Sequence, residues 1–171
     1  MKQGFIHIYC GDGKGKTTAA AGLALRAKGA GLEVCFGQFM KSGNSSELSA
    51  LKKADISVFS VQNTFGFTWK MTLEQKEALH RINSDAIRKL LSEKEKYDVL
   101  ILDEIVSAYQ HELVDRELVC QLLRERDKTE IVLTGRNPSE ELLEMADYVT
   151  EMKCVKHPYE KGVQARLGIE Y

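Results

Sequence analysis

The stretch covering residues 5–30 constrains the fold more than any other part of the sequence. An apolar run, 5–9, is followed by a segment rich in glycine and lysine, 10–18, and then by an alanine-rich segment that indicates a helix to residue 30. A strand, a glycine turn and a helix start in this order form a cradle in which backbone N–H groups and the helix N-terminus attract phosphate. The segment therefore predicts a phosphate-binding loop.

Two side chains at the helix start sharpen this prediction. Lys16 adds a full positive charge and Thr17 can offer its hydroxyl to Mg²⁺, which suits a nucleoside triphosphate. An ordinary glycine-rich connection is not favoured, because the strand, the Gly-Lys-Thr sequence and the helix coincide as the motif requires. The predicted nucleotide-binding residues of the loop are Gly11, Asp12, Gly13, Lys14, Gly15, Lys16, Thr17 and Thr18.

The loop departs from the strict pattern G-x-x-x-x-G-K-[ST] at one position. That pattern places its first glycine where this chain has Cys10, and here the glycine follows one residue later, at Gly11. The departure leaves open how a nucleotide lies in the loop.

The size and charge of the chain restrict its class. Its 171 residues, 43% of them hydrophobic, fit a single domain spanning 1–171. The net charge of −1, with 24 basic residues scattered among 25 acidic ones, offers no basic surface for nucleic acid. No apolar run approaches the ~18 residues of a membrane span, and the first strand begins without a basic leader or apolar signal region. We therefore expect a cytoplasmic protein without nucleic-acid or membrane partners.

The cysteines predict free thiols rather than a metal site or disulfides. Cys10, Cys35, Cys120 and Cys154 lie far apart, without C-x-x-C spacing, and three of them fall inside apolar strand or helix patterns.

Strands and helices alternate along the chain, which predicts an α/β fold. We expect a mainly parallel sheet with helices on both faces and right-handed crossovers, an arrangement that is P-loop NTPase-like and RecA-like. The strand at 56–61 alternates apolar and polar residues, so we expect it at a sheet edge or at the surface. Strands are predicted at 5–9, 33–40, 56–61, 98–104, 130–134 and 148–154, and helices at 19–30, 47–53, 72–94, 114–126 and 140–146.

The helix predicted at 72–94 carries two further signals. Thr72 with Gln75 predicts a capping box at its start. Apolar residues at a spacing of about 3.6 residues predict the face that packs on the sheet, namely Leu79, Ile82, Ala86, Ile87, Leu90 and Leu91.

Two carboxylates end the most apolar strand. Asp103 and Glu104 follow residues 98–102, and a buried parallel strand delivers such groups to the carboxyl edge of its sheet, facing the phosphate loop. We expect one or both to hold Mg²⁺ beside a triphosphate. A general acid and base pair is the alternative.

Other candidates carry less definite signals. Arg136 ends a strand, where contact with an anionic ligand or a structural ion pair would suit it equally well. Arg26, nine residues beyond Thr17, is a surface arginine on its own sequence context, and His157 is a loop histidine whose role stays open. The aromatic residues of loop 62–69 would plug the core or offer a flat apolar surface to a large ligand. Because no nucleophile and base pair stands out, the chemistry indicated is positioning and charge stabilisation around a nucleotide.

Taken together, these motifs resemble the P-loop type of corrinoid adenosyltransferase, the CobA/BtuR family. The resemblance covers nearly the whole chain and includes seven ordered motifs. These are Gly11 to Thr18, Gln38-Phe39 with Lys41, Gly66-Phe67-Thr68-Trp69, Asp103-Glu104-Ile105, Leu133 to Arg136, Ala146 to Met152, and Lys156 to Tyr159 with Gly162, Ala165 and Arg166.

The resemblance implies a reaction and a set of partners. It implies transfer of the 5′-deoxyadenosyl group of ATP to the Co(I) of a reduced corrinoid, with Mg²⁺ as cofactor and release of whole triphosphate, in adenosylcobalamin biosynthesis or salvage. ATP in this family lies in the opposite sense from the usual P-loop pose, which fits the shifted Gly11. A homodimer and a flavoprotein reductant are implied as well.

The resemblance also implies roles for individual residues. Arg26 falls on a position that contacts the triphosphate, and Glu104 on one near the metal. Phe67 and Trp69 match an aromatic pair that closes over the corrinoid and displaces its lower ligand, so they join Lys16 as expected catalytic residues. Asp12 stands where other members often carry asparagine.

Two rival functions remain at this point. A P-loop kinase or NTPase would act on the γ-phosphate, and a nucleotide-binding regulatory module would bind without turnover. The identity of the product distinguishes all three.

Overall fold

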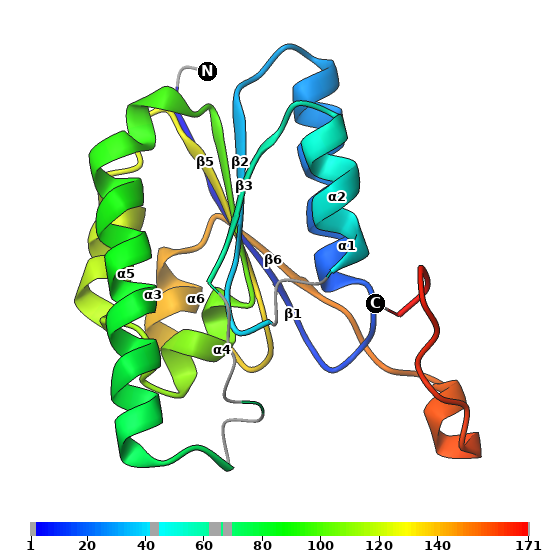
Figure 1. Ribbon diagram of the computed structural model, residues 1–171. Coiled ribbons are helices and arrows are strands. Elements are labelled where there is room, and N and C mark those ends of the chain that lie inside the picture. Colours follow the sequence, from blue (N-terminus) through cyan, green and yellow to red (C-terminus); the bar gives the residue numbers. More distant parts are fainter. Residues whose placement is uncertain (1–2, 42–44, 62–65, 67–69, 171) are drawn as a thin grey trace.

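A computed structural model describes residues 3–41, 45–61, 66 and 70–170 of the chain, and these form a parallel six-stranded sheet in the order β3-β2-β4-β5-β1-β6 (Figure 1). The strand β4 pairs with β2 on one side and with β5 on the other, so it lies in the interior of the sheet. The strands are β1 (Ile6–Cys10), β2 (Val34–Gln38), β3 (Ser57–Ser60), β4 (Val99–Asp103), β5 (Glu130–Thr134) and β6 (Tyr148–Glu151).

Helices cover both faces of this sheet. Two of them, α1 and α2, lie on one face, and α3 to α6 lie on the other (Figure 1). The arrangement confirms the predicted α/β fold with a parallel sheet. The helices are α1 (Lys16–Gly29), α2 (Ser46–Lys53), α3 (Leu73–Glu93), α4 (Ile105–Gln110), α5 (Arg116–Arg124) and α6 (Glu140–Met145).

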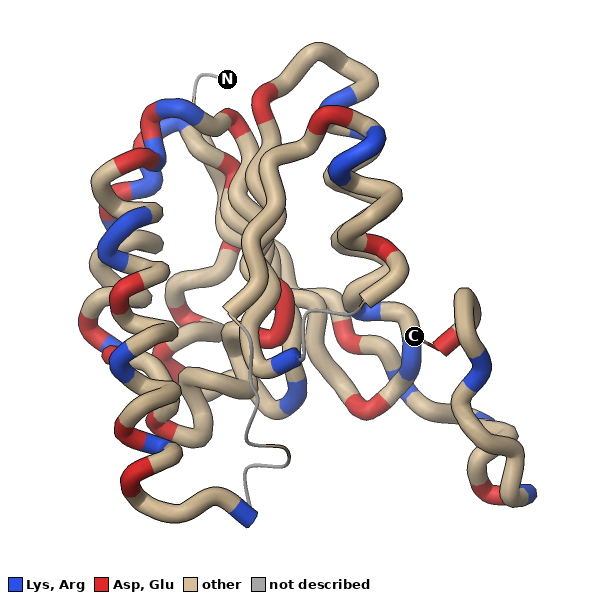
Figure 2. The backbone as a smooth tube through the Cα atoms, in the orientation of Figure 1, with Lys and Arg blue, Asp and Glu red and all other residues tan. Residues whose placement is uncertain are grey.

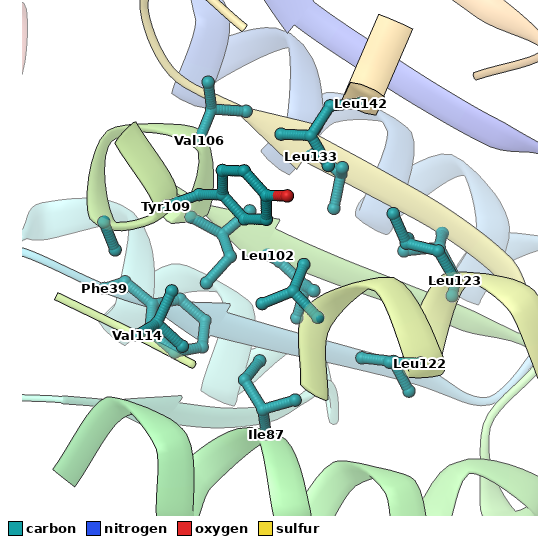
Figure 3. Packing of buried hydrophobic residues seen from close by; sticks show 14 of the residues in the cluster. Phe39, Ile87, Leu102, Val106, Tyr109, Val114, Leu122, Leu123, Leu133 and Leu142 are labelled. Atoms are coloured by element: carbon teal, nitrogen blue, oxygen red, sulfur yellow. The ribbon is translucent and has the colours of Figure 1, made fainter. Parts of the chain in front are cut away.

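The core consists of two apolar clusters, one on each face of the sheet. The larger one joins β4 and β5 to the helices α3 to α6, with Tyr109 and Leu102 among its fully buried members (Figure 3). The smaller one packs α1 against the sheet through small side chains, Ala20, Ala24 and Ala27, which let the helix lie close to the strands. Because both faces of β4 are covered, all five of its residues are buried.

Several local predictions are confirmed. The strand β3 is at the sheet edge, and Thr72 with Gln75 forms the expected capping box at the start of α3. The four cysteines are free, and Cys154 alone among them is not fully buried. No helix in the described part of the chain is both long enough and apolar enough to cross a membrane.

Other local predictions were wrong. The helix α4 was not expected, because it has only six residues and its N-cap, Glu104, has a left-handed backbone and no side-chain cap. The strand β6 ends at Glu151 rather than at 154, and α5 begins at Arg116 rather than at 114. The side chain of Ile82, expected on the buried face of α3, is 48% exposed.

Candidate active site

The glycine-rich loop runs from the end of β1 to the start of α1 and lies against the chain that follows β6. The N–H of Gly13 donates to the carbonyl of Met152 across 2.7 Å, and the N–H of Met152 donates to Cys10 across 2.9 Å. A Cβ on Gly11 or Gly13 would come within 2.4 or 2.7 Å of the Met152 carbonyl oxygen. Only glycine lets the loop approach this segment, and Gly11 also has a φ of 96° that glycine tolerates best.

Asp12 links the glycine-rich loop to the segment after β6 through a hydrogen bond. Its Oδ1 accepts a hydrogen bond of 3.0 Å from the N–H of Cys154. That bond to the charged carboxylate holds the pKa of Asp12 below its usual value. The structure thus gives this residue a role in shaping the loop.

Lys16 lies folded over the loop that precedes it. Its Nζ donates to the carbonyls of Gly11 and Gly13, each across 2.7 Å, and the residue is only 8% exposed. Burial lowers the pKa of this ammonium, and the positive charge of Arg136 lowers it further. The loop therefore holds a positive charge at the N-terminus of α1, where an anion would be attracted.

Asp103 is the centre of a hydrogen-bond network at the carboxyl edge of the sheet. Its Oδ1 accepts from the hydroxyls of Thr17 and Thr134, both at 2.8 Å. Its Oδ2 accepts from Nε2 of Gln38 at 3.2 Å and from Nζ of Lys41 at 2.9 Å. The sheet order explains this meeting, because β5 lies between β1 and β4 and so brings Thr134 between the loop and Asp103.

The charge of Asp103 also acts on Lys41. Burial by itself would lower the pKa of this lysine, but the carboxylates of Asp103 and Glu47 and the hydrogen bond to Asp103 outweigh burial and raise it. Lys41 is therefore a cation in this network.

Glu104 follows Asp103 and turns toward the opening of the site. Its backbone has a φ of 62°, its N–H donates to Thr134 across 2.9 Å, and its Oε2 accepts from the Ser107 hydroxyl across 2.7 Å. These contacts fix the carboxylate at the edge of the cleft described next.

A cleft of about 1010 Å³ opens above the loop. Both acidic and basic residues cluster at the end of the sheet where the loop lies (Figure 2). Along the outer helix α3, acidic and basic residues alternate instead. The volume lies at the upper end of the range for small-molecule sites. The cleft is lined by Asp12, Gly13, Lys14, Gly15, Lys16, Thr17, Thr18, Ala21, Lys41, Ser46, Glu47, Ala50, Glu104, Arg136, Cys154, His157, Tyr159, Ala165, Gly168, Ile169 and Glu170.

The C-terminal segment forms one wall of this cleft. It folds back toward the start of α1 (Figure 1), and Nζ of Lys14 donates to the carbonyl of Ile169 across 2.9 Å. Sequence patterns did not indicate this wall, because the segment shows no strand or helix period. His157, whose role stayed open, lies in the wall, where its Nδ1 accepts from the N–H of Tyr159.

The structure brings most of the expected site residues together and separates one. Arg136 and Glu104 join the loop residues in the cleft, and Lys41, Gln38 and Thr134 are additions that the strand-end positions could have indicated. Arg26 lies exposed in the last turn of α1, about 13 Å along the helix from Thr17 at the usual rise per residue. Its contact with a triphosphate stays a prediction from the resemblance, and Phe67 and Trp69 lie outside the described residues.

The residues around Asp103 fit a hard divalent cation. Mg²⁺ prefers hydroxyl, carboxylate, phosphate and water oxygens, and Thr17 and Asp103 offer the first two, with Glu104 nearby. Among the described residues, no group of three or more His, Cys, Asp or Glu could hold a metal on its own. A metal here would therefore take its other oxygens from water or from a bound phosphate, and P-loop proteins share the metal with a nucleotide in the second way.

The parallel sheet, the loop at the start of α1 and the carboxylate at the end of β4 define a P-loop nucleotide-binding protein. A model of the family described as ATP:corrinoid adenosyltransferase BtuR/CobO/CobP matches residues 2–171. The chain therefore belongs to the ATP:corrinoid adenosyltransferase family. It is a transferase, and its substrates are ATP and a corrinoid.

Individual relatives agree with the family match. A corrinoid adenosyltransferase of Escherichia coli (strain K12) is 36% identical over 173 residues, covering 99% of this chain and 87% of that protein. One from Sinorhizobium sp is 33% identical over 175 residues, with 99% and 81% covered. The corrinoid adenosyltransferase CobA of Salmonella typhimurium (strain LT2) is 33% identical over 172 residues, with 99% and 87% covered.

Proposed function

We propose that this enzyme transfers the 5′-deoxyadenosyl group of ATP to the Co(I) of cob(I)alamin or cob(I)yrinic acid a,c-diamide, and that it releases inorganic triphosphate. The observation that carries the proposal is the cradle itself. Lys16 and the Thr17–Asp103 pair surround the place where phosphates would lie, at the floor of a cleft large enough for a second substrate. The reaction would serve adenosylcobalamin biosynthesis or salvage.

The proposed step requires no nucleophile from the protein. An electron pair of Co(I) attacks C5′ of the ribose, the C5′–O5′ bond breaks, and its electrons leave with the triphosphate oxygen. The cobalt ends as an alkylated Co(III), so electrons balance without a further oxidant. The enzyme's task is to hold the two substrates in line and to stabilise the charge that grows on the leaving group.

The residues of the cradle suit that task. Lys16 and the N–H groups of the loop would donate to the triphosphate, and Arg136, which lines the same cleft and acts on the charge of Lys16, would add positive charge. Thr17, Asp103 and Glu104 would hold Mg²⁺. When bound, this ion supplies further positive charge to the departing triphosphate.

Several finer assignments rest on the family resemblance. Phe67 and Trp69 would close over the corrinoid and displace its lower axial ligand, which makes reduction to Co(I) easier and excludes water. Arg26 would contact the triphosphate. A flavoprotein would supply the electron, the enzyme would be a homodimer, and the cytoplasmic location expected from the sequence stays a prediction.

The test is the identity of the phosphate product. The full-length enzyme is incubated with ATP, Mg²⁺ and chemically reduced cob(I)alamin without oxygen, and phosphate products are separated by ion chromatography. We expect one inorganic triphosphate for each adenosylcobalamin and none when corrinoid is omitted. ADP or orthophosphate as the main product would instead indicate a kinase or NTPase. Tight ATP binding with no product at all would indicate a regulatory module.

A further inference from the structure

Lys41 places an ammonium group between the residues that we assign to Mg²⁺. Its Nζ lies 2.9 Å from Oδ2 of Asp103 and 3.1 Å from the Thr17 hydroxyl oxygen. A third oxygen, Oε1 of Glu47, lies 3.6 Å away. Three oxygens from three different elements thus surround one cation of the protein itself.

This ammonium offsets a charge that the fold has buried. Asp103 is 0% exposed, and its other hydrogen-bond donors, the side chains of Thr17, Thr134 and Gln38, are neutral. Among the described residues, Lys41 supplies the one ion pair that Asp103 makes. A buried carboxylate without a counter-ion is strongly unfavourable, so some cation has to stay beside it.

A divalent metal ion and the ammonium of Lys41 cannot both bind these oxygens tightly, because two cations a few ångströms apart repel each other. A metal that takes Thr17 and Asp103 must therefore displace the ammonium of Lys41. That ammonium then needs a new anion, and Lys41 lines the same cleft as Lys16 and the glycine loop. Its flexible stem allows it to turn toward a bound triphosphate while the backbone stays in place.

We propose that Lys41 is a tethered counter-ion that occupies the metal position in the nucleotide-free enzyme and yields it only when triphosphate arrives with the metal. The inference rests on the proposed function, which assigns Thr17 and Asp103 to Mg²⁺. Its consequence is cooperativity. Metal alone binds weakly because it takes Asp103, the nearer of the two carboxylates that Lys41 contacts, away from the ammonium. A bound triphosphate replaces that lost anion, so metal and triphosphate favour each other's binding.

The test is a titration of the nucleotide-free enzyme with Mn²⁺. The concentration of unbound Mn²⁺ is measured by electron paramagnetic resonance, and it gives the dissociation constant. We expect weak binding to the wild type, and binding at least about tenfold tighter in Lys41→Met and Lys41→Gln, which lack the competing charge. Lys41→Arg keeps a cation and should stay weak. Lys28→Met is the matched control, because Lys28 pairs with Glu33 and Asp55 away from the cleft, and it should bind like the wild type.

Thermal unfolding gives a second readout. Without divalent ions, Lys41→Met should unfold at a lower temperature than the wild type, and Mg²⁺ should restore much of the difference while leaving the wild type unchanged. If that variant folds only with Mg²⁺, the metal has replaced the ammonium as proposed. Unfolding that Mg²⁺ does not relieve, or an unchanged Mn²⁺ affinity in both neutral variants, would overturn the inference.

This outcome can be separated from that of the proposed function. The Mn²⁺ titration contains no corrinoid and no ATP. If the product assay yields ADP while the neutral variants bind Mn²⁺ more tightly, the proposed reaction fails and the counter-ion role stands. If triphosphate is the product while the Mn²⁺ affinity of the neutral variants is unchanged, the proposed reaction stands and the counter-ion role fails.

Discussion

The hydroxyl of Thr17 donates to Oδ1 of Asp103 across 2.8 Å, although the two residues are 86 positions apart in the chain. The bond joins the first turn of α1 to the end of β4, and Thr134 donates to the same oxygen from the strand between them. The phosphate loop and the carboxylate that we assign to Mg²⁺ are therefore held as one unit before any ligand binds. Such preorganisation is what a reaction governed by charge stabilisation requires.

Asp103→Asn tests this unit. The substitution keeps the shape of the side chain but removes the charge that Mg²⁺ would use, so kcat/KM for adenosyl transfer should fall by about a hundredfold or more. Steady-state kinetics across a range of Mg²⁺ concentrations provides the measurement. Asp85→Asn is the control, because Asp85 is an exposed residue paired with Arg88 on α3, and it should leave the rate unchanged. A rate near that of the wild type in Asp103→Asn would contradict the assignment.

Lys16→Ala tests the cradle. The ammonium that now bonds to the carbonyls of Gly11 and Gly13 is the group we expect to contact the triphosphate. Its removal should weaken ATP binding at least about a hundredfold, as the loss of a charged hydrogen bond to an anion does, and should abolish transfer. Isothermal titration with ATP measures the first effect. Lys28→Ala, at the other end of α1, should bind ATP normally, and wild-type turnover in Lys16→Ala would refute the cradle.

Two glycines, one in the loop and one inside α1, should respond in opposite directions to alanine. A Cβ on Gly13 would lie 2.7 Å from the Met152 carbonyl oxygen, so Gly13→Ala must push the loop away from the segment after β6. We expect the free energy of unfolding to fall by about 1–3 kcal/mol and ATP affinity to fall with it. Gly22 lies inside α1 with nothing within 4 Å of its would-be Cβ. Gly22→Ala should therefore raise the free energy of unfolding by about 0.5–1 kcal/mol, and urea denaturation compares the two.

The sequence predicted the parts of this protein whose signals are local. The loop from Gly11 to Thr18, the capping box at Thr72 and the apolar run ending at Asp103 each depend on neighbouring residues, and the structure confirms these elements. The sheet edge at β3 followed from its alternating pattern in the same way.

Features that depend on contacts between distant segments could not be predicted. Asn83 and Ser84 lie buried on α3 because Asn83 donates to the carbonyl of Leu113 and Ser84 accepts from the N–H of Asp115, and no helical pattern marks them. The cleft wall near Ile169 could not be predicted for the same reason. It forms only because the C-terminal segment folds back and its Ile169 carbonyl accepts a hydrogen bond from Lys14. The distant position of Arg26 follows from the helix rise, whereas its expected contact came from resemblance alone.

Trp69→Ala tests the aromatic pair that the resemblance assigns to the corrinoid. If Trp69 displaces the lower axial ligand, its loss should slow turnover from Co(II) corrinoid with a reductant much more than turnover from Co(I) prepared beforehand. Anaerobic assays that start from each oxidation state provide the comparison. Equal losses in the two assays would remove the proposed role in ligand displacement.

The cysteines offer a probe of the cleft that does not depend on turnover. Burial raises the pKa of Cys35 to about 12 and also raises the pKa values of Cys10 and Cys120, and all three thiols are buried, so they should react slowly in the native enzyme. Cys154 is not fully buried and lines the cleft. At pH 8 we therefore expect a chromogenic disulfide to modify one thiol quickly in the native enzyme and the others only after unfolding.

Ligand protection then reports on the site. Saturating ATP with Mg²⁺ should slow the fast modification several-fold, because the nucleotide fills the cleft that Cys154 faces. Cys154→Ser is the control and should lack the fast phase while binding ATP normally. Since the Asp12 carboxylate accepts from the backbone N–H of residue 154, which serine retains, that substitution leaves the contact between loop and wall in place. A fast phase that survives in Cys154→Ser would show that a different thiol reacts. A fast phase that belongs to Cys154 but is not slowed by ATP would show that ATP leaves this wall of the cleft uncovered.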